Sequence, residues 1–206
     1  MSHSPLSSLR PAHPVEAQIL ARIPENVRER ASAVRLMAFD IDGVLTDGRL
    51  WYGEHGEITK SFHALDGHGM RMLRECGITV ALITGREGPI AARRAAELGI
   101  ADIHQGVRDK GRVLADLAQK HGLSLEQTGF MGDDLIDLPA FQKAGFTASV
   151  SSAPFYITQS VHWISQAAGG DGAARECCDL ILAAQGRLGA FLQTGGASTV
   201  LPGVPQ

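Results

Sequence analysis

The sequence is poor in cysteine and has no long apolar run and no excess of basic residues. Its cysteines are Cys76, Cys177 and Cys178, an odd number with two adjacent, which excludes a disulfide framework and a spaced zinc motif. No segment approaches the roughly 20 apolar residues that span a bilayer. Lys and Arg (19) do not outnumber Asp and Glu (22), so nothing indicates a nucleic-acid surface. We therefore expect neither membrane nor nucleic acid as a partner.

The N-terminal stretch lacks the apolar segment of a secretory signal. It reads "MSHSPLSSLRPAHP", which is rich in Ser, Pro and His. Since the cysteine pattern also gives no sign of an oxidising compartment, we predict a cytoplasmic protein.

The length of 206 residues suits one ordinary domain with a real core. We expect an N-terminal extension with a short helix over residues 1–30 and a single domain over 31–190. Residues 191–206 include "GGASTVLPGVPQ", whose Gly and Pro content predicts a flexible tail.

Short apolar segments alternate with helical ones through the predicted domain. Strands are expected at 34–39, 78–84, 102–105, 128–132 and 146–150, and helices at 68–76, 89–98, 110–122 and 134–145. Such alternation is typical of an α/β fold with a doubly wound parallel sheet. Residues 48–63 break the rhythm with two β-prone arms around "GEHG", which predicts a projecting β-hairpin.

Acidic residues crowd together directly after the first predicted strand. The segment "FDIDGVLTDG" holds Asp40, Asp42 and Asp47, although an ionised carboxylate loses hydration at the end of a buried strand. A cation would stabilise such a cluster, and ligands that are all oxygen favour a hard ion such as Mg²⁺.

Three further polar segments are expected at the same edge, because ligands bind beyond the carboxyl ends of the strands in a doubly wound sheet. They are "TGR" (84–86), Lys110 and "GDDLID" (132–137). A hydroxyl, an ammonium and a metal ion suit the charge of a phosphoryl group. A carboxylate in such a site can attack phosphorus.

The sequence resembles the haloacid dehalogenase-like phosphatases. The four motifs of that family are matched, in order, by "DIDGVLTDG", Thr84, Lys110 and "GDDLID". The resemblance implies their Rossmannoid (HAD-like) fold and an aspartyl-phosphate mechanism. It implies catalytic roles for Asp40 as the nucleophile and Asp42 as the general acid/base. The implied phosphate-binding residues are Thr84, Gly85 and Lys110. The implied Mg²⁺ ligands are Asp40, the main-chain carbonyl of Asp42, and Asp133, supported by Asp134 and Asp137.

The spacing of the motifs leaves no room for a cap domain. Only 44 positions separate Asp40 from Thr84, and 23 separate Lys110 from Asp133. The capless subgroup that the sequence resembles shields its sites by pairing hairpins in a homotetramer. Its substrate is a small phosphorylated keto sugar acid. The nearest resemblance is to enzymes that hydrolyse the 8-phosphate of 3-deoxy-D-manno-octulosonate in lipopolysaccharide precursor synthesis. Phosphatases of nine-carbon keto sugar acid 9-phosphates share nearly all the motifs and remain an alternative.

For several side chains the sequence leaves two possible roles open. Arg86 would bind a substrate carboxylate or a surface acid, and Arg175 would reach a site, its own or a neighbour's, or close an ion pair on a helix. His68 is a candidate substrate contact, with a purely structural role as the alternative. Asp47 suits a turn better than catalysis. The hairpin residues Glu57 and Lys60 would face sugar hydroxyls or water.

Two functions of other classes compete with the phosphatase. A phospho-receiver signalling domain also combines acidic residues, a hydroxyl and a lysine with Mg²⁺. However, it places its acidic pair first and lacks a second Asp two residues after the acceptor. An inert scaffold would have lost catalytic residues, whereas all the residues with implied chemical roles are present here.

Overall fold

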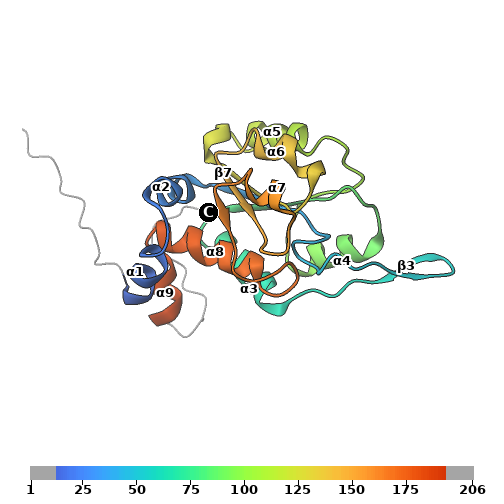
Figure 1. Ribbon diagram of the computed structural model, residues 1–206, viewed down its shortest axis with the longest axis horizontal. Helices are drawn as coiled ribbons and strands as arrows, with labels where there is room; N and C mark the ends of the chain where they lie inside the picture. Colours follow the sequence, from blue (N-terminus) through green and yellow to red (C-terminus); the bar gives the residue numbers. More distant parts are fainter. Residues whose placement is uncertain (1–12, 194–206) are drawn as a thin grey trace, which may run out of the picture.

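A six-stranded parallel sheet forms the centre of the molecule (Figure 1). In the computed structural model, which describes residues 13–193, the strand order is β5–β4–β1–β6–β7–β8. The central strand β1 is fully buried and pairs with β4 on one side and β6 on the other. The strands are β1 (Leu36–Phe39), β4 (Thr79–Ile83), β5 (Asp102–His104), β6 (Thr128–Met131), β7 (Phe146–Ser149) and β8 (Trp163–Ile164).

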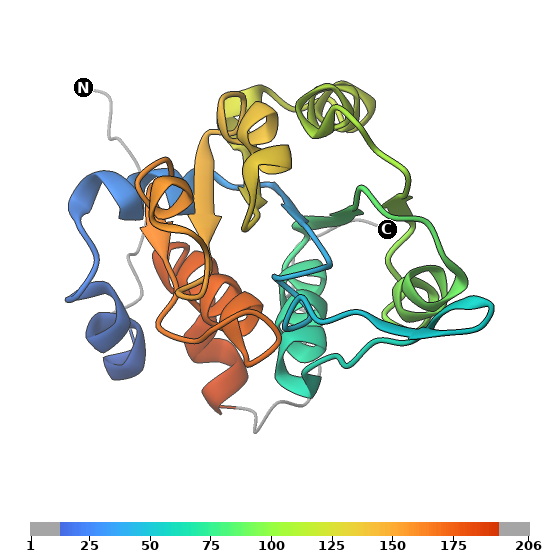
Figure 2. The same ribbon diagram turned by 45° about the vertical axis from the view of Figure 1, so that its right-hand side comes forward.

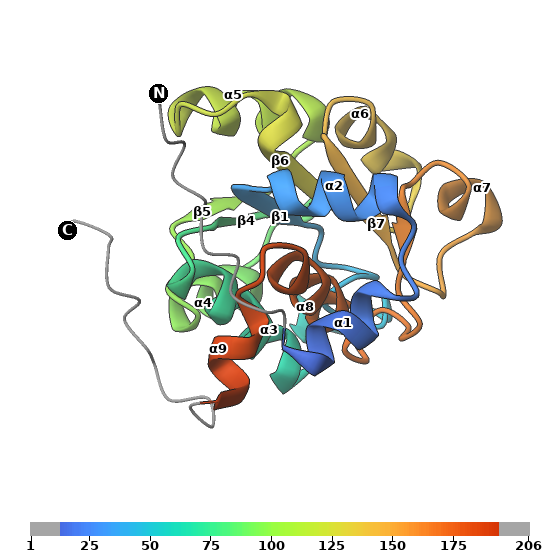
Figure 3. The same cartoon turned by 90° about the vertical axis from the view of Figure 1, so that its left-hand side faces the viewer.

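Helices cover both faces of the sheet, as Figure 3 shows. The larger of two hydrophobic cores packs one group of helices against the sheet: α1 (Pro14–Leu20), α2 (Glu25–Ala33), α3 (Ala64–Glu75), α4 (Pro89–Glu97), α8 (Ala173–Ala184) and α9 (Leu188–Gln193). The smaller core lies under α5 (Lys110–Lys120), α6 (Leu138–Phe141) and α7 (Phe155–Thr158). Two short 3₁₀ turns, η1 (Leu125–Gln127) and η2 (Leu135–Asp137), flank β6.

The segment between β1 and α3 forms a two-stranded antiparallel hairpin that projects from the body (Figures 1 and 2). Its strands are β2 (Trp51–Gly53) and β3 (Gly56–Thr59), with Tyr52 opposite Glu57. Large apolar side chains stay exposed on it, among them Trp51 (55%), Tyr52 (59%) and Ile58 (64%).

The structure confirms the predicted α/β class, the doubly wound parallel sheet and the hairpin, and no cap domain interrupts residues 13–193. One predicted helix is wrong in extent: 134–145 is split into η2 and α6 and ends at Phe141. Pro139 has no N–H to donate to residue 135, so the first turn cannot continue as α-helix. Helix α3 begins four residues before the prediction because the His63 ring nitrogen caps it, accepting from Leu65 N–H at 3.3 Å.

The predicted N-terminal extension is described from residue 13 on, where α1 and the start of α2 lie, whereas most of the predicted tail lies outside the described residues. Helix α9 continues to Gln193, so the first three residues of the predicted tail are helical. Nothing further bears on residues 1–12 or 194–206. Between residues 13 and 193, no helix has the length and apolar character needed to cross a membrane.

Candidate active site

Three neighbouring strands deliver polar side chains to one edge of the sheet. Asp40 follows β1, Thr84 follows β4, and Asp133 follows β6 after one glycine. Each loop begins where the ladder of the sheet ends: Asp40 N–H donates to Met131 O and Thr84 N–H donates to His104 O, both at 2.9 Å. The order β4–β1–β6 therefore places Asp40 between the other two.

Lys110 connects two of the acidic loops. Its Nζ lies 2.7 Å from Asp40 Oδ2 and 2.6 Å from Asp137 Oδ1, and the residue is fully buried. The other oxygen of Asp137 accepts from the N–H groups of Asp133 (2.8 Å) and Asp134 (3.1 Å). Asp137 thus orients both the lysine and the loop that carries Asp133.

Burial and the neighbouring charges of this cluster shift the pKa of Asp40, Asp133 and Lys110. Burial, together with the charge of Asp137, raises the pKa of Asp40 to about 7 against the opposing effect of Lys110. Burial and the charges of Asp40 and Asp137 likewise raise the pKa of Asp133 to about 7. Burial works to lower the pKa of Lys110, but the two carboxylates outweigh it and the pKa is raised. Lys110 is thus one cation against three carboxyl groups.

The cluster fits a divalent cation. Oxygens of Asp40, Asp133 and Asp137 lie within 4.8 Å of one another. Within the described residues, Asp133 Oδ1 is buried without a hydrogen-bond partner, which leaves this oxygen free to bind a cation. When all three carboxylates are ionised, the one ammonium of Lys110 leaves two negative charges uncompensated. Hard oxygen ligands of this kind select Mg²⁺, so the residues present fit that ion.

Two glycines allow the carboxylates to come this close. Gly43 has φ +94°, and a Cβ there would overlap the Asp133 carboxylate. A Cβ on Gly132 would overlap the carboxylate of Asp137. Gly43 therefore meets two requirements, a left-handed backbone and a close approach.

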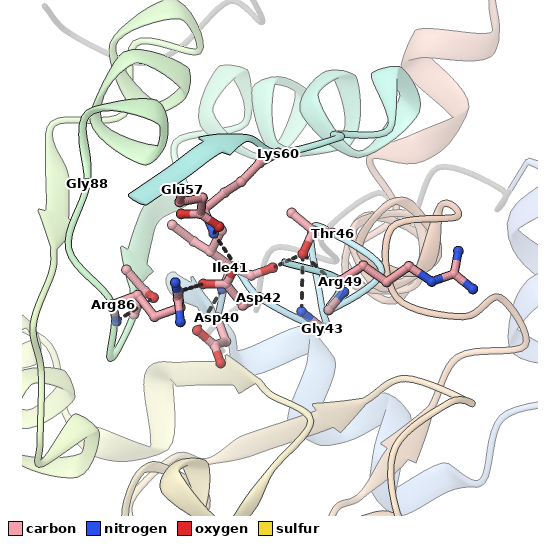
Figure 4. A network of polar contacts seen from close by, with 12 residues as sticks. Asp40, Ile41, Asp42, Gly43, Thr46, Arg49, Glu57, Lys60, Arg86 and Gly88 are labelled. Carbon is pink, nitrogen blue, oxygen red and sulfur yellow. Dashed lines mark hydrogen bonds and ion pairs between the residues drawn. The ribbon is translucent and has the colours of Figure 1, made fainter. Parts of the chain in front are cut away.

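Asp42 lies in the same loop as Asp40, directly after β1, but its side chain faces the hairpin (Figure 4). Its Oδ1 accepts a hydrogen bond from Lys60 Nζ, and Lys60 also donates to Glu57 Oε1 at 2.8 Å. Its Oδ2 lies 3.9 Å from Arg86 Nε. The backbone of the loop is fixed separately, because Thr46 Oγ1 accepts from the N–H groups of Gly43 and Gly48.

A pocket of about 330 Å³ opens between Asp42, the hairpin and α4. The buried Thr84 lies at its floor, and Thr84 Oγ1 accepts from Arg86 N–H at 3.2 Å. The Arg86 guanidinium donates to the Tyr52 hydroxyl and lies over that ring at 5.7 Å. The lining includes charged residues of both signs (Asp42, Glu57, Lys60, Arg86 and Glu87) and the neutral Gln105.

The structure does not bring every predicted residue to this pocket. Arg175 pairs with Asp179 at 2.8 Å and lies 3.4 Å from His68 Nδ1, so both predicted substrate contacts join an α3–α8 cluster outside the pocket lining. This arrangement is the ion pair on a helix that was the alternative for Arg175. A contact of either residue with substrate, in this subunit or a neighbour's site, stays a prediction.

Two acidic residues have local roles. The side chain of Asp134 caps η2 by accepting from Leu135 N–H at 2.7 Å, and it lies outside the cluster of three carboxylates. Asp47 accepts from Arg49 N–H at 3.0 Å and so closes a turn, the structural alternative for this residue. The supporting role of Asp134 stays a prediction, as does metal binding by the Asp42 carbonyl.

The sequence did not point to Tyr52 or Gln105 as pocket residues. It also did not decide whether Lys60 faces the site or water. Gln105 Oε1 accepts from Gly88 N–H at 2.9 Å and so fixes the start of α4 at the pocket. No motif marks these residues. For the hairpin, the pairing of Tyr52 with Glu57 required the register, which alternation alone does not supply.

Comparison with known proteins agrees with this geometry. The profile of a haloacid dehalogenase-like hydrolase family matches residues 94–176. The chain is 42% identical over 165 residues to the 3-deoxy-D-manno-octulosonate 8-phosphate phosphatase KdsC of Haemophilus influenzae, covering 80% of this chain and 92% of that protein. It is 39% identical over 175 residues to KdsC of Escherichia coli K12, covering 85% and 89%.

A solved structure has the same architecture. The 3-deoxy-D-manno-octulosonate 8-phosphate phosphatase from Moraxella catarrhalis, in complex with a magnesium ion, a phosphate ion and a KDO molecule, superposes with a TM-score of 0.80 at 41% identity. The match covers 82% of this chain and 97% of that one.

We predict that Mg²⁺ stabilises the protein more at pH 8 than at pH 5.5. The raised pKa values of Asp40 and Asp133, about 7 against 3.8, mean that the metal-free fold loses stability as pH rises through this range. Mg²⁺ needs both groups ionised and must displace protons at pH 5.5. At a free Mg²⁺ concentration of about 100 times Kd, the free energy of unfolding at pH 8 should rise by about 2.7 kcal/mol. This corresponds to an increase of roughly 5–10 °C in Tm.

Thermal unfolding with and without Mg²⁺ at the two pH values measures this difference. Asp133→Asn is the control and should remove most of the shift at pH 8. An equal or larger shift at pH 5.5 in the unsubstituted protein would contradict the prediction.

Proposed function

The chain belongs to the 3-deoxy-D-manno-octulosonate 8-phosphate phosphatases of the haloacid dehalogenase-like hydrolases, and we propose that it hydrolyses this eight-carbon sugar acid phosphate to the free sugar acid and phosphate. The product would enter lipopolysaccharide precursor synthesis. The observation that carries the proposal is the placement of Asp40. One of its oxygens accepts from Ile41 N–H at 2.7 Å and the other pairs with the buried Lys110, at the rim shared with Thr84.

In the first half of the reaction, an oxygen of Asp40 attacks phosphorus and the bond from phosphorus to the sugar oxygen breaks. Asp42, in its protonated form, gives its proton to the leaving alkoxide, which becomes the sugar hydroxyl. Thr84, Gly85 and Lys110 bind the non-bridging oxygens through a hydroxyl, an N–H and an ammonium. Asp40 is left as an aspartyl-phosphate.

In the second half, Asp42 accepts a proton from water as the water oxygen attacks phosphorus. The bond from phosphorus to Asp40 breaks, phosphate leaves and both carboxyl groups return to their starting state. Asp40, Asp133 and the carbonyl of Asp42 would hold Mg²⁺, with Asp134 and Asp137 supporting them. When bound, the ion balances negative charge on the phosphoryl oxygens.

Arg86 suits the carboxylate of the sugar acid. Its guanidinium faces the pocket and is held by Tyr52 rather than by an acid at short range. A guanidinium binds a carboxylate with two parallel hydrogen bonds, which favours an acidic sugar over a neutral one.

The exposed hairpin supports a homotetramer, and the free cysteines support a cytoplasmic location. Trp51, Tyr52 and Ile58 would be costly to leave in water, and pairing of hairpins from several subunits would cover them and close the pocket. All three cysteines are buried free thiols, as expected in a reducing compartment.

Asp40→Asn should abolish turnover, by at least about 10³-fold, because a neutral amide does not attack phosphorus. Release of phosphate from the sugar 8-phosphate measures the effect, and circular dichroism and sedimentation should show an unchanged fold and assembly. Activity within tenfold of the unsubstituted protein would refute the role of Asp40.

A comparison of substrates tests the sugar. We expect kcat/KM for the eight-carbon 8-phosphate to exceed that for nine-carbon keto sugar acid 9-phosphates by at least about tenfold, a difference of about 1.4 kcal/mol. Preference for a 9-phosphate would support the nine-carbon alternative instead.

Sedimentation velocity at micromolar concentration should give four times the 21.9 kDa chain mass. Ile58→Lys should shift the protein to smaller species, because a charge would be buried at the hairpin interface. Phe155→Lys is the matched control, since Phe155 on α7 is also exposed (72%) but lies away from the hairpin. A monomeric unsubstituted protein would contradict the assembly.

A further inference from the structure

Lys60 is a buried cation at the base of the hairpin with no role in the mechanism above. Its side chain is only 5% exposed, and those of its two partners, Asp42 and Glu57, are 16% and 11% exposed. A buried ammonium is costly unless it is paired, and here both partners are carboxylates. Figure 4 shows Lys60 reaching from the hairpin toward Asp42, with Glu57 beside it.

The geometry fixes one oxygen of Asp42 and leaves the other free. Oδ1 accepts from Lys60, whereas Oδ2 is buried and has no hydrogen-bond partner within residues 13–193. The nearby Arg86 Nε, at 3.9 Å, is too far for a hydrogen bond. A carboxyl group tied at one oxygen has its other oxygen directed, here toward the side of Arg86 and the pocket.

The backbone does not impose this orientation. The Thr46 hydroxyl holds the main chain of the loop, since its hydrogen bonds go to the backbone of Ile41, Gly43 and Gly48. Lys60 is in turn anchored by Glu57, which lies in β3 opposite Tyr52. The side chain of Asp42 is therefore oriented by the hairpin rather than by the loop to which it belongs.

We propose that Lys60 is a positioning residue that aims the Asp42 carboxyl at the leaving oxygen, and that it thereby couples hairpin placement to proton transfer. The inference rests on the proposed function, in which Asp42 protonates the sugar alkoxide. Misplacing a catalytic group by about 1 Å can cost about 10²-fold in rate. Glu57 contributes through Lys60 and is expected to have a smaller effect.

The choice of leaving group separates this role from others. An alkoxide is a strong base and needs the proton of Asp42, whereas p-nitrophenolate is a stable anion and needs little help. We expect Lys60→Met to lower kcat/KM about 10²-fold for the sugar 8-phosphate and for a simple alkyl phosphate such as propyl phosphate. The loss for p-nitrophenyl phosphate should be less than about fivefold. Lys60→Arg should restore most of the loss.

Three controls accompany the measurement. Asp42→Asn should give the same pattern across the three substrates. Adding Lys60→Met to Asp42→Asn should cause no further loss, because Lys60 acts through Asp42. Arg49 is a cation at the entry to the hairpin, and its side chain is 79% exposed. Arg49→Met should leave kcat/KM unchanged for all three substrates.

Other outcomes overturn the proposal. A loss confined to the sugar 8-phosphate would make Lys60 a substrate contact, and an equal loss on all three substrates would make it a structural residue. A further loss in the double variant would also refute action through Asp42. Full activity of Asp40→Asn would instead refute the proposed function, so the two failures are distinguishable.

Discussion

Three carboxylates that share a single ammonium at the carboxyl edge of the sheet are the constraint on which the site depends. Asp40, Asp133 and Asp137 converge on one buried point, and Lys110 balances only one of them. Charges are held in such a place only when the surrounding fold enforces it. The enforcement is visible in the backbone: the glycines at 43 and 132 admit the carboxylates, and two N–H groups orient Asp137.

The rest of the site is supplied by the hairpin, because no cap domain covers the pocket. Both arms of the hairpin contact the site: Tyr52 in β2 binds Arg86, and Lys60, which follows β3 and pairs with Glu57, binds Asp42. The two carboxylates of the DxD motif thus have different supports. Asp40 is held by the sheet and α5, while Asp42 is held by an element that projects from the body.

Much of this arrangement was predictable from the sequence. Strands that lead into Asp40, Thr84 and the GDD segment must share one edge of a parallel sheet, and that rule placed the proposed nucleophile, the hydroxyl and the acidic loop together. The rule does not reach side chains whose position depends on packing between distant elements. Arg175 meets His68 because α8 packs against α3, and Lys60 turns inward because the hairpin places it beside Asp42. Helix α2 buries only Val27 and Ala31, too little apolar surface to mark it.

The pairing of β1 has a consequence for how the chain folds. Residues 36–39 join 79–82 on one side and 128–131 on the other, so β1 cannot complete its ladders until most of the chain has collapsed. Contacts this distant in sequence form slowly. The proposed magnesium ligands come from both sides of the last of these pairings, and a partly folded chain therefore lacks the complete set of ligands. Magnesium should act on the finished fold, retarding its unfolding without accelerating its formation.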